Sequence, residues 1–425
     1  MGLLVDFARS IIDNHLWLYL NFSFFFFILQ FLIVKKHLYS IFDPLVMFVF
    51  FNGFSWSTVL MVSYVNDNYF YLFDISVINL CFLIPALFFK KIDLHQLHST
   101  ILMRTKSFDF QVFYVFFFVL AFSTISLWLI RGVPLFSENP DRAKSVLYEE
   151  GFGIVRYIHF VIPLFCVFFS LFCITYLKNS IVRKIILVTI LFFSILIMLS
   201  MGSKSSLLAV VLVCGLVGVT DFNNLNARFI RKVSYLIMIL AIFFVFLVLF
   251  FVSGDNSILA LLNLLMIRMI AFGDSFFFWY QYDLVKEMES INLIFYLLSP
   301  LLGMFRFIEQ EFPLGSQLVS AVTGEDLVSF GPNGQLPIVI SLVSSYFKYF
   351  LSVMFGFLFF FIRNNLYYLI QKLRVFGLVL FVGVFFDLTY IYTDILLLMS
   401  KIYSSVITFI IIYLLMLFLR ACSKK

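Results

Sequence analysis

The chain has 425 residues, of which 63% are hydrophobic and only 12% are charged, with a net charge of +6 and a mean hydropathy of +1.08. Soluble domains carry about 45–50% apolar and about 25% charged residues, so a soluble fold would leave far too much apolar surface in water. The composition therefore predicts an all-α, polytopic integral membrane protein in contact with membrane lipids. The basic residues stand in short clusters beside apolar runs, which does not indicate a nucleic-acid partner.

The sequence predicts about eleven transmembrane helices, because a helix needs about 20 apolar residues to cross the hydrocarbon core. A separate cleaved leader is not expected, since no basic stretch precedes the first apolar run, which is interpreted as an anchor. The predicted spans are 16–34, 41–63, 70–89, 110–130, 154–177, 184–200, 204–220, 233–252, 337–362, 373–393 and 402–419.

Most of the 29 Lys and Arg residues fall in every second loop between these spans, including Arg363 in the loop that follows 337–362. The positive-inside rule places those loops in the cytoplasm. The opposite side then holds two large loops, about 131–153 and about 253–336. The second contains apolar stretches with isolated charges, which suit interfacial or re-entrant helices. If one of them spans the membrane, the count becomes twelve. The whole chain, 1–425, is expected to form one transmembrane domain.

The five Cys residues give no disulfide framework and no zinc spacing, because four lie inside apolar runs and one in the terminal tail. No Asp-x-Asp motif occurs, so the usual metal site for nucleotide sugars is missing. We therefore expect neither a metal nor another cofactor.

The segment "RGVPLFSENPDRAKSVLYEEGFG", Arg131 to Gly153, is a polar island between two spans. Pro134 excludes a regular helix at its start. Asn139, Pro140 and Asp141 then suit the first positions of a short helix, and Gly151 suits its end. The island therefore predicts an extended stretch followed by a short capped helix.

The island resembles the periplasmic loop of bacterial O-antigen and oligosaccharide repeat-unit polymerases of the Wzy class. That loop reads approximately G-x-P-L-F, then an Arg, then G-x-G before the next span. The matching residues here include Arg142, which is followed by ten residues and then Gly153; the others are Gly132, Pro134, Leu135, Phe136 and Gly151. Members of the family also share this chain length, the span pattern and the richness in Phe, of which this chain has 62.

Two further strings support the resemblance. "SMGSKSSLL", Ser200 to Leu208, forms a tight turn between spans where the family often has Gly-Ser-Arg-Ser, and Lys204 replaces that Arg. Gly-Ser at the start of a helix offers free N–H groups, so this turn is a candidate anion site. A Walker A loop is excluded, because position 197 is Ile where a Gly is required. The third string is the Gly- and Pro-rich loop from Gly324, in which Asn333 and Gly334 suit a tight turn.

The resemblance implies a GT-C-like glycosyltransferase at the periplasmic face of the bacterial inner membrane. It would transfer a growing O-antigen or related glycan, in lipopolysaccharide biosynthesis, from undecaprenyl pyrophosphate onto another lipid-linked repeat unit. A chain-length regulator protein is the implied partner. The leaving pyrophosphate needs positive charge, and Arg supplies it with fork geometry.

The predicted site therefore has Arg142, Glu149 and Glu325 as catalytic residues. The predicted pyrophosphate ligands are Arg131, Lys204, Arg268, Arg306 and Gly153. Arg268 and Arg306 stand in apolar stretches, where a charge needs a partner or a role. The acceptor's general base stays open among Glu149, Glu150, Asp274, Glu325 and His159.

Simpler interpretations stand beside these roles. Arg131 and Lys204 also suit interface anchors, and Arg268 and Arg306 suit anchors of amphipathic helices. Arg156 and His159, near the start of a span, suit packing or interface positions. Lys348 and Asp387 are interpreted as an ion pair inside the membrane.

Two other functions remain open on the sequence. A flippase or exporter of lipid-linked oligosaccharides shares the membrane and the substrate, but it would place its basic residues along a central cavity within the spans. An O-antigen ligase-like transferase shares the architecture, but such ligases usually carry a His in the large loop, and 253–336 has none.

Overall fold

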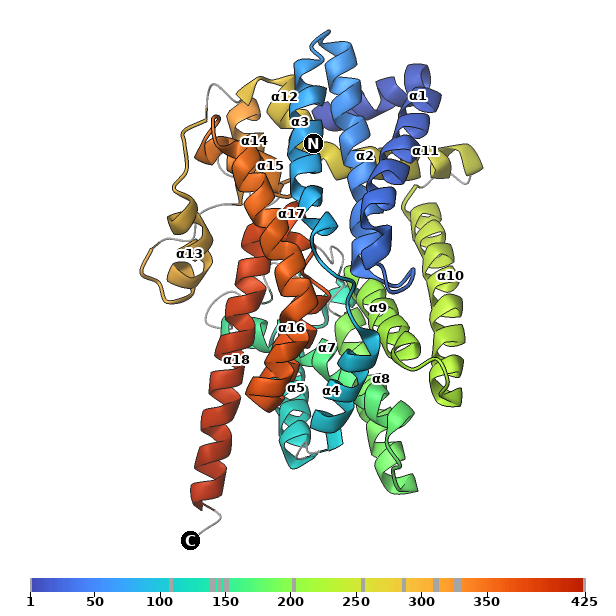
Figure 1. The fold of residues 1–425 in the computed structure, drawn as a ribbon, viewed down its shortest axis with the longest axis vertical. Helices are drawn as coiled ribbons and strands as arrows, with labels where there is room; N and C mark the ends of the chain where they lie inside the picture. Colours follow the sequence, from blue (N-terminus) through green and yellow to red (C-terminus); the bar gives the residue numbers. More distant parts are fainter. Residues whose placement is uncertain are drawn as a thin grey trace. The chain divides into compact units, whose positions relative to one another are not determined.

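The computed structural model of the chain describes residues 2–106, 110–137, 143, 147, 153–200, 204–253, 257–284, 288–308, 313–324 and 331–422. Every regular element in this part of the chain is helical (Figure 1). By length and composition, nine helices among the described residues can cross a membrane. The described chain is therefore that of a polytopic membrane protein.

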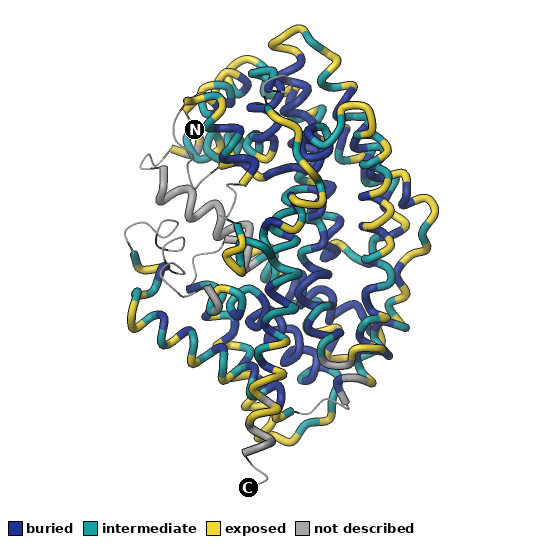
Figure 2. Tube along the Cα trace, turned by 90° about the vertical axis from the view of Figure 1, so that its left-hand side faces the viewer, coloured by how far each residue is buried: buried dark blue, intermediate teal, exposed yellow. Residues whose placement is uncertain are grey.

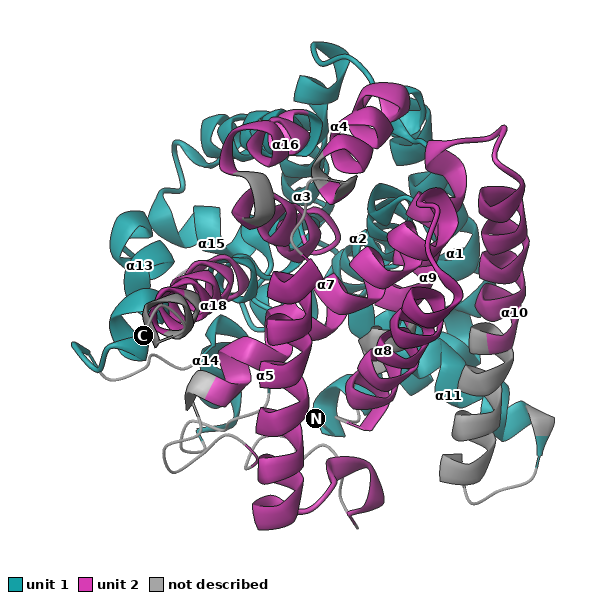
Figure 3. Ribbon diagram, turned by 90° about the horizontal axis from the view of Figure 1, so that it is seen from below, with its two compact units in different colours: residues 1–91, 242–364, 388–399 teal, residues 92–241, 365–387, 400–425 magenta. Residues whose placement is uncertain are grey.

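The chain divides into two compact units that interleave along the sequence (Figure 3). Unit 1 comprises residues 1–91, 242–364 and 388–399, and unit 2 comprises residues 92–241, 365–387 and 400–425. In both units the buried residues are mostly apolar, and further apolar residues are exposed along the helices. Figure 2 shows the buried and exposed positions along the trace. Exposed Phe and Leu residues suit a lipid surround, since lipid rather than water is the solvent for such positions.

Unit 1 is built on a contact between α1 and α2, onto which α3, α11 and α12 pack. A Cβ on Gly53 of α2 would lie 2.9 Å from the Ser23 carbonyl oxygen of α1, so only a glycine allows this approach. Figure 1 shows α11 lying across α1 and α2. The helices of this unit are α1 (Gly2–Val34, kinked at His15), η1 (Lys35–His37), α2 (Pro44–Val65), α3 (Phe70–Leu83), η2 (Ile84–Leu87), α11 (Ile258–Ile270), η4 (Ala271–Gly273), α12 (Asp274–Gln281), α13 (Leu293–Met304), α14 (Leu314–Thr323), α15 (Leu336–Val343) and α17 (Tyr390–Thr393).

Unit 2 is built around α7, which packs against α5, α8 and α9. Two Phe rings of α7, Phe165 and Phe169, lie against Phe113 of α5, so part of the Phe richness serves packing. The helices of this unit are α4 (Leu94–Lys106), α5 (Phe110–Arg131), η3 (Pro134–Phe136), α7 (Gly153–Tyr176), α8 (Ile181–Ser200) and α9 (Lys204–Thr220). Three long helices have residues in both units: α10 (Leu225–Ser253), α16 (Lys348–Phe385) and α18 (Ile395–Cys422).

Two predicted spans, 337–362 and 373–393, are not continuous helices. The first is divided into α15 and the start of α16 by residues 344–347, and the second is divided between the end of α16 and α17. The predicted turn between them is nevertheless present. A Cβ on Gly377 would lie 2.1 Å from the Leu369 carbonyl oxygen, whereas these positions in a straight helix are about 12 Å apart. The chain therefore reverses direction within α16.

The region 253–336, predicted to hold interfacial or re-entrant helices, contains α11 and α12 on either side of η4. Together, residues 259–281 are long and apolar enough to span, although the helix is interrupted. The interruption is stabilised by side chains, because Ser55 donates to the Phe272 carbonyl at 2.6 Å and Thr58 donates to the Ile270 carbonyl at 3.1 Å. Gln335 also donates to Phe272, at 2.9 Å. Irregular backbone is tolerated in a membrane protein where protein groups satisfy it in this way.

Arg363 was predicted to lie in a loop, and this part of the prediction is wrong, because Arg363 lies within α16. Its guanidinium is buried in unit 1, where Nη1 and Nη2 donate to the two carboxylate oxygens of Asp43 at 2.9 and 2.6 Å. Nη2 also donates to the His37 carbonyl. Asp43 accepts from the backbone of Tyr39 and caps α2 by accepting from Leu45. The pair ties the start of α2 to α16.

Arg363→Met is expected to lower the free energy of unfolding by about 3–5 kcal/mol, because it leaves the Asp43 carboxylate buried without its guanidinium. Thermal and denaturant unfolding of the purified protein in detergent measures this. The double variant Asp43→Asn/Arg363→Met should lose less than the two single changes together, since Asn retains the helix cap. Arg183→Met, at an exposed position of α8, is the control. A wild-type unfolding midpoint for Arg363→Met contradicts the stabilising role.

Candidate functional site

The ends of α5 and α7 bring the two borders of the polar island together in unit 2. The helices are antiparallel, and Thr124 of α5 contacts His159 of α7 with 2.9 Å between Oγ1 and Nε2. At 1.5 Å per residue, Arg131 and Gly153 both lie about 10 Å beyond this contact, in the same direction. The island therefore leaves and re-enters unit 2 at one end, with the start of α7 beside the end of α5.

The sequence ends α5 sharply at this point. Gly132 adopts a left-handed conformation with φ of 79°, and its N–H donates to the Trp128 carbonyl at 2.9 Å, as a C-terminal helix cap requires. Pro134 then begins η3, a single tight turn that packs against α8. The prediction that this stretch is not a regular α-helix is confirmed.

A trace of the predicted island helix is also present. The N–H of Leu147 donates to the Ala143 carbonyl at 3.0 Å, which is the spacing of an α-helical turn. Leu147 is buried. The predicted cap residues Asn139 and Asp141 lie outside the described residues, as does Gly151.

The same end of unit 2 receives α16 and α18. Gly383 of α16 lies so close to α18 that a Cβ there would be 2.8 Å from Ser405 Oγ, and 3.8 Å from Val161 Cγ1 of α7. About one helical turn further towards the mouth, Asp387 of α16 pairs with Lys401 of α18 at 2.7 Å. By the same count, this pair lies level with Arg156 on α7.

We call this end of unit 2 the cationic mouth, defined by Arg131, Arg156, Lys401, Asp387 and His159. Arg156 is exposed and Arg131 is half-buried. Among the described residues of the mouth, the basic side chains outweigh the carboxylate. The N-terminus of α7 adds the positive end of a helix dipole. Arg131, Arg156 and the start of α7 therefore bring positive charge to this end of the unit, where Lys401 is paired with Asp387.

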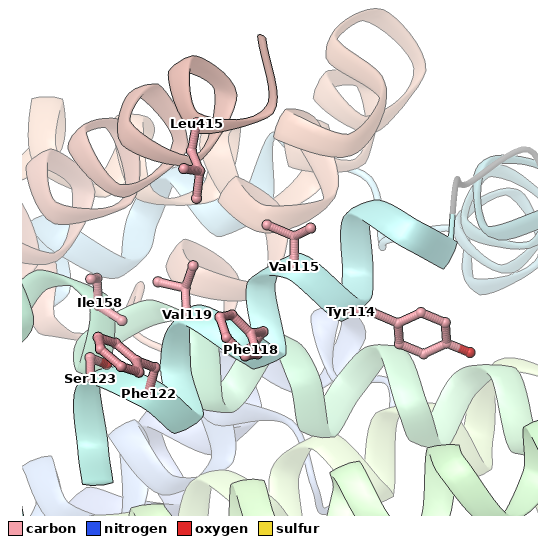
Figure 4. A pocket seen from close by; sticks show the side chains of 8 residues that line it. All are labelled: Tyr114, Val115, Phe118, Val119, Phe122, Ser123, Ile158 and Leu415. Atoms are coloured by element: carbon pink, nitrogen blue, oxygen red, sulfur yellow. The ribbon is translucent and has the colours of Figure 1, made fainter. Parts of the chain in front are cut away.

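An apolar cavity runs along α5 (Figure 4). Its volume is about 600 Å³, and it is lined by side chains of α5, α7 and α18: Tyr114, Val115, Phe118, Val119, Phe122, Ser123, Ile158 and Leu415. Phe118 and Phe122 are exposed on its wall. Ser123, at its upper end, also lies 3.4 Å from His159 Nε2. Ser123 of the cavity wall therefore adjoins His159 of the mouth.

Lys204, a predicted pyrophosphate ligand, begins α9 in unit 2. Tyr176 near the end of α7 donates to the Val217 carbonyl near the end of α9 at 2.5 Å. Equal numbers of residues back from this contact along the two helices lead to Lys204 on α9 and Pro163 on α7. The Lys204 backbone is therefore about 6 Å deeper in the bundle than His159. The Lys204 backbone thus lies below the mouth, in the same unit.

Arg268 and Arg306 belong to unit 1. Arg268 is exposed near the end of α11, and Arg306 is exposed after α13 with a left-handed φ of 58°. Asp274, a candidate base, begins α12 in the same unit. The residues predicted to be catalytic, Arg142, Glu149 and Glu325, lie outside the described residues. The candidate base Glu150 also lies outside them.

The predicted pair of Lys348 and Asp387 is wrong, because each residue has a different partner. Lys348 contacts Asp74 of α3 at 2.5 Å in unit 1, and Tyr349 donates to the same carboxylate at 2.8 Å. Asp387 pairs with Lys401 in unit 2. An isolated Asp and Lys in neighbouring apolar runs were the available signal for this pair.

The apolar helices define the class, a polytopic membrane protein. No protein-family model, no curated protein and no solved structure matches the chain.

A charge exchange tests the assignment of partners at the mouth. Asp387→Lys is expected to lower detergent-phase stability, because it sets two ammonium groups against each other, and Lys401→Asp in the same chain should restore most of the loss. The measurement is the thermal midpoint of the purified variants.

The matched control is Asp387→Lys combined with Lys348→Asp, which should give no restoration. Rescue by Lys348→Asp instead of Lys401→Asp would contradict the observed pairing.

Proposed function

We propose that the protein is a glycan polymerase of the bacterial inner membrane, with its site at the periplasmic face. It transfers a growing O-antigen or related polysaccharide from undecaprenyl pyrophosphate onto the sugar of a lipid-linked repeat unit. The enzyme is a glycosyltransferase of GT-C-like architecture that needs no cofactor, and a chain-length regulator is its partner. The sequence basis of this proposal is the resemblance of the island, from Arg131 to Gly153, to the periplasmic loop of Wzy-class polymerases.

The observation that carries the proposal is the cationic mouth between the two borders of that island. The leaving group of the reaction is a lipid pyrophosphate, on which negative charge develops as the glycosidic bond breaks. Arg131 and Arg156 have the fork geometry that suits phosphate oxygens. Charges fixed in advance at a water-poor mouth stabilise such a transition state more than they would in bulk water.

The general base that deprotonates the acceptor sugar would lie near the mouth. His159 lies there, with its Nε2 against the hydroxyls of Ser123 and Thr124. A neutral imidazole in this position can take the proton from a hydroxyl of the acceptor sugar when that sugar is bound within reach of the ring. Glu149 and Glu150 belong to the same island in sequence, so they remain alternatives to His159.

The rival function of a flippase is less well supported. It requires basic side chains along a path through the spans, and Lys348, Arg363 and Lys401 are candidates by position. Each contacts a carboxylate: Asp74, Asp43 and Asp387, respectively. These pairs neutralise the positive charge that would draw a lipid phosphate through the bundle. A ligase-like transferase differs only in its acceptor, so the acceptor assay below separates it.

Purified protein in detergent should convert undecaprenyl pyrophosphate-linked repeat units into polymer without any added nucleotide. Gel separation of the released glycans measures chain length. Transfer only onto a lipid A core acceptor would identify a ligase instead. Absence of any transfer, together with movement of the lipid-linked repeat across vesicles, would identify a flippase.

Arg142→Ala and Arg131→Ala should each leave membrane insertion intact and give lipid A capped with single repeats, without a long ladder. The rate in the purified assay is expected to fall about 10²–10³-fold, as for loss of one charge-stabilising donor. Arg131→Lys should recover only part of the rate, because an ammonium lacks the fork.

Arg183→Ala is the matched control. Arg183 stacks on Phe110 at the opposite end of α5, so this variant should retain the wild-type ladder. A normal ladder from Arg142→Ala would remove Arg142 from the site.

A further inference from the structure

We propose that the break between α11 and α12 in unit 1 binds one small monovalent cation, Na⁺. The site lies at η4, where the helix within residues 259–281 is interrupted. Its ligands are backbone carbonyls at the break, hydroxyls of α2 and a side-chain amide, and the Asp274 carboxylate supplies the negative charge. All of these groups belong to unit 1, and none of them belongs to the cationic mouth.

Oxygen atoms of two backbone carbonyls and two hydroxyls come together at the break. Ser55 Oγ lies 2.6 Å from the carbonyl oxygen of Phe272. Thr58 Oγ1 lies 3.1 Å from the carbonyl oxygen of Ile270, and Ser55 and Thr58 share one face of α2 because they are three residues apart. Gln335 Nε2 is 2.9 Å from the same Phe272 carbonyl. The three side chains are buried, so these polar groups meet away from water.

Each hydroxyl has a second acceptor on its own helix. Ser55 Oγ is also 3.3 Å from the Phe51 carbonyl oxygen. Thr58 Oγ1 is also 3.1 Å from the Phe54 carbonyl oxygen. Each hydroxyl proton can therefore turn to α2 while the oxygen lone pairs face the break, and Gln335 can rotate its amide to present Oε1. The carbonyls at the break then exchange their donors for a cation, and no polar group loses its last partner.

The charge at the break has the sign that a cation needs. The C-terminal end of α11 and the N-terminal end of α12 meet there, so their opposite dipole ends offset each other. The Asp274 carboxylate accepts from the Ser275 N–H at 2.7 Å, and it forms no ion pair among the described residues. Arg268, on the preceding helix, is exposed. One carboxylate therefore remains to balance one positive charge.

The ligand set favours Na⁺ over other ions. Unwound backbone carbonyls at a helix break are ligands that Na⁺ uses in membrane proteins. Ca²⁺ sites draw on several carboxylates, and transition metals prefer His and Cys. The described part of the chain has no group of three or more His, Cys, Asp or Glu residues that could hold such an ion. The close spacing of the oxygens at Ser55 and Thr58 suits an ion smaller than K⁺.

The test is equilibrium binding of radioactive Na⁺ to the purified full-length protein in nanodiscs, with choline as the other cation of the buffer. We expect saturable binding, with K⁺ competing at least about tenfold more weakly than unlabelled Na⁺. Na⁺ in place of choline should also raise the thermal midpoint, because an ion that binds only the folded state stabilises it.

Three substitutions remove separate parts of the site. Ser55→Ala and Thr58→Val each remove one oxygen, and Asp274→Asn removes the charge. Each should weaken Na⁺ binding by about tenfold or more, whereas Thr58→Ser keeps the hydroxyl and should bind Na⁺ as the wild type does. The matched control is Ser57→Ala, which removes a buried hydroxyl of α2 that has no hydrogen-bond partner among the described residues. This control should leave Na⁺ binding unchanged.

Thermal midpoints in choline show which variants fold. The three substitutions act at different positions, so one that fails to fold leaves the other two as tests. The site is overturned if the wild type shows no saturable Na⁺ binding, or if K⁺ competes as well as Na⁺. Wild-type affinity in a folded Asp274→Asn or Thr58→Val variant would overturn it equally.

Discussion

A charge among apolar helices must find a partner of opposite sign, because lipid offers it neither water nor counterions. This protein meets that constraint with carboxylates on other segments: Asp43 for Arg363, Asp74 for Lys348 and Asp387 for Lys401. Each pair joins helices that the sequence separates, so the charges also specify which helices are neighbours.

The long apolar spans and the all-helical class were predictable, because twenty apolar residues in succession can satisfy their backbone only as a helix in lipid. The breaks were not. The backbone of η4 is irregular because Ser55, Thr58 and Gln335 satisfy it from other segments. Nothing in the composition of residues 253–336 reveals those partners. Local sequence sets the capacity to form a helix, and tertiary contacts decide where it stops.

The candidate site likewise has features that could be predicted from the sequence and features that could not. The end of α5 could be predicted from Gly132 and Pro134, because Gly132 suits a left-handed helix cap and Pro134 suits the start of a new turn. The partners of Lys348 and Asp387 were not, because an ion pair depends on which helices pack together. Arg156 and His159 were interpreted as interface or packing residues. Their place at the same end as the Asp387–Lys401 pair depends on the close approach of α7, α16 and α18 at Gly383.

The cavity wall carries exposed side chains, Phe118 and Phe122, rather than being closed by protein on every side. A lipid entering it would therefore arrive by lateral diffusion within the bilayer and would never need to leave the hydrocarbon. Its occupancy would follow the mole fraction of that lipid in the membrane, not its amount per volume of solution. Dilution with inert lipid would then lower the occupancy of the cavity, and an enlarged aqueous volume would leave it unchanged.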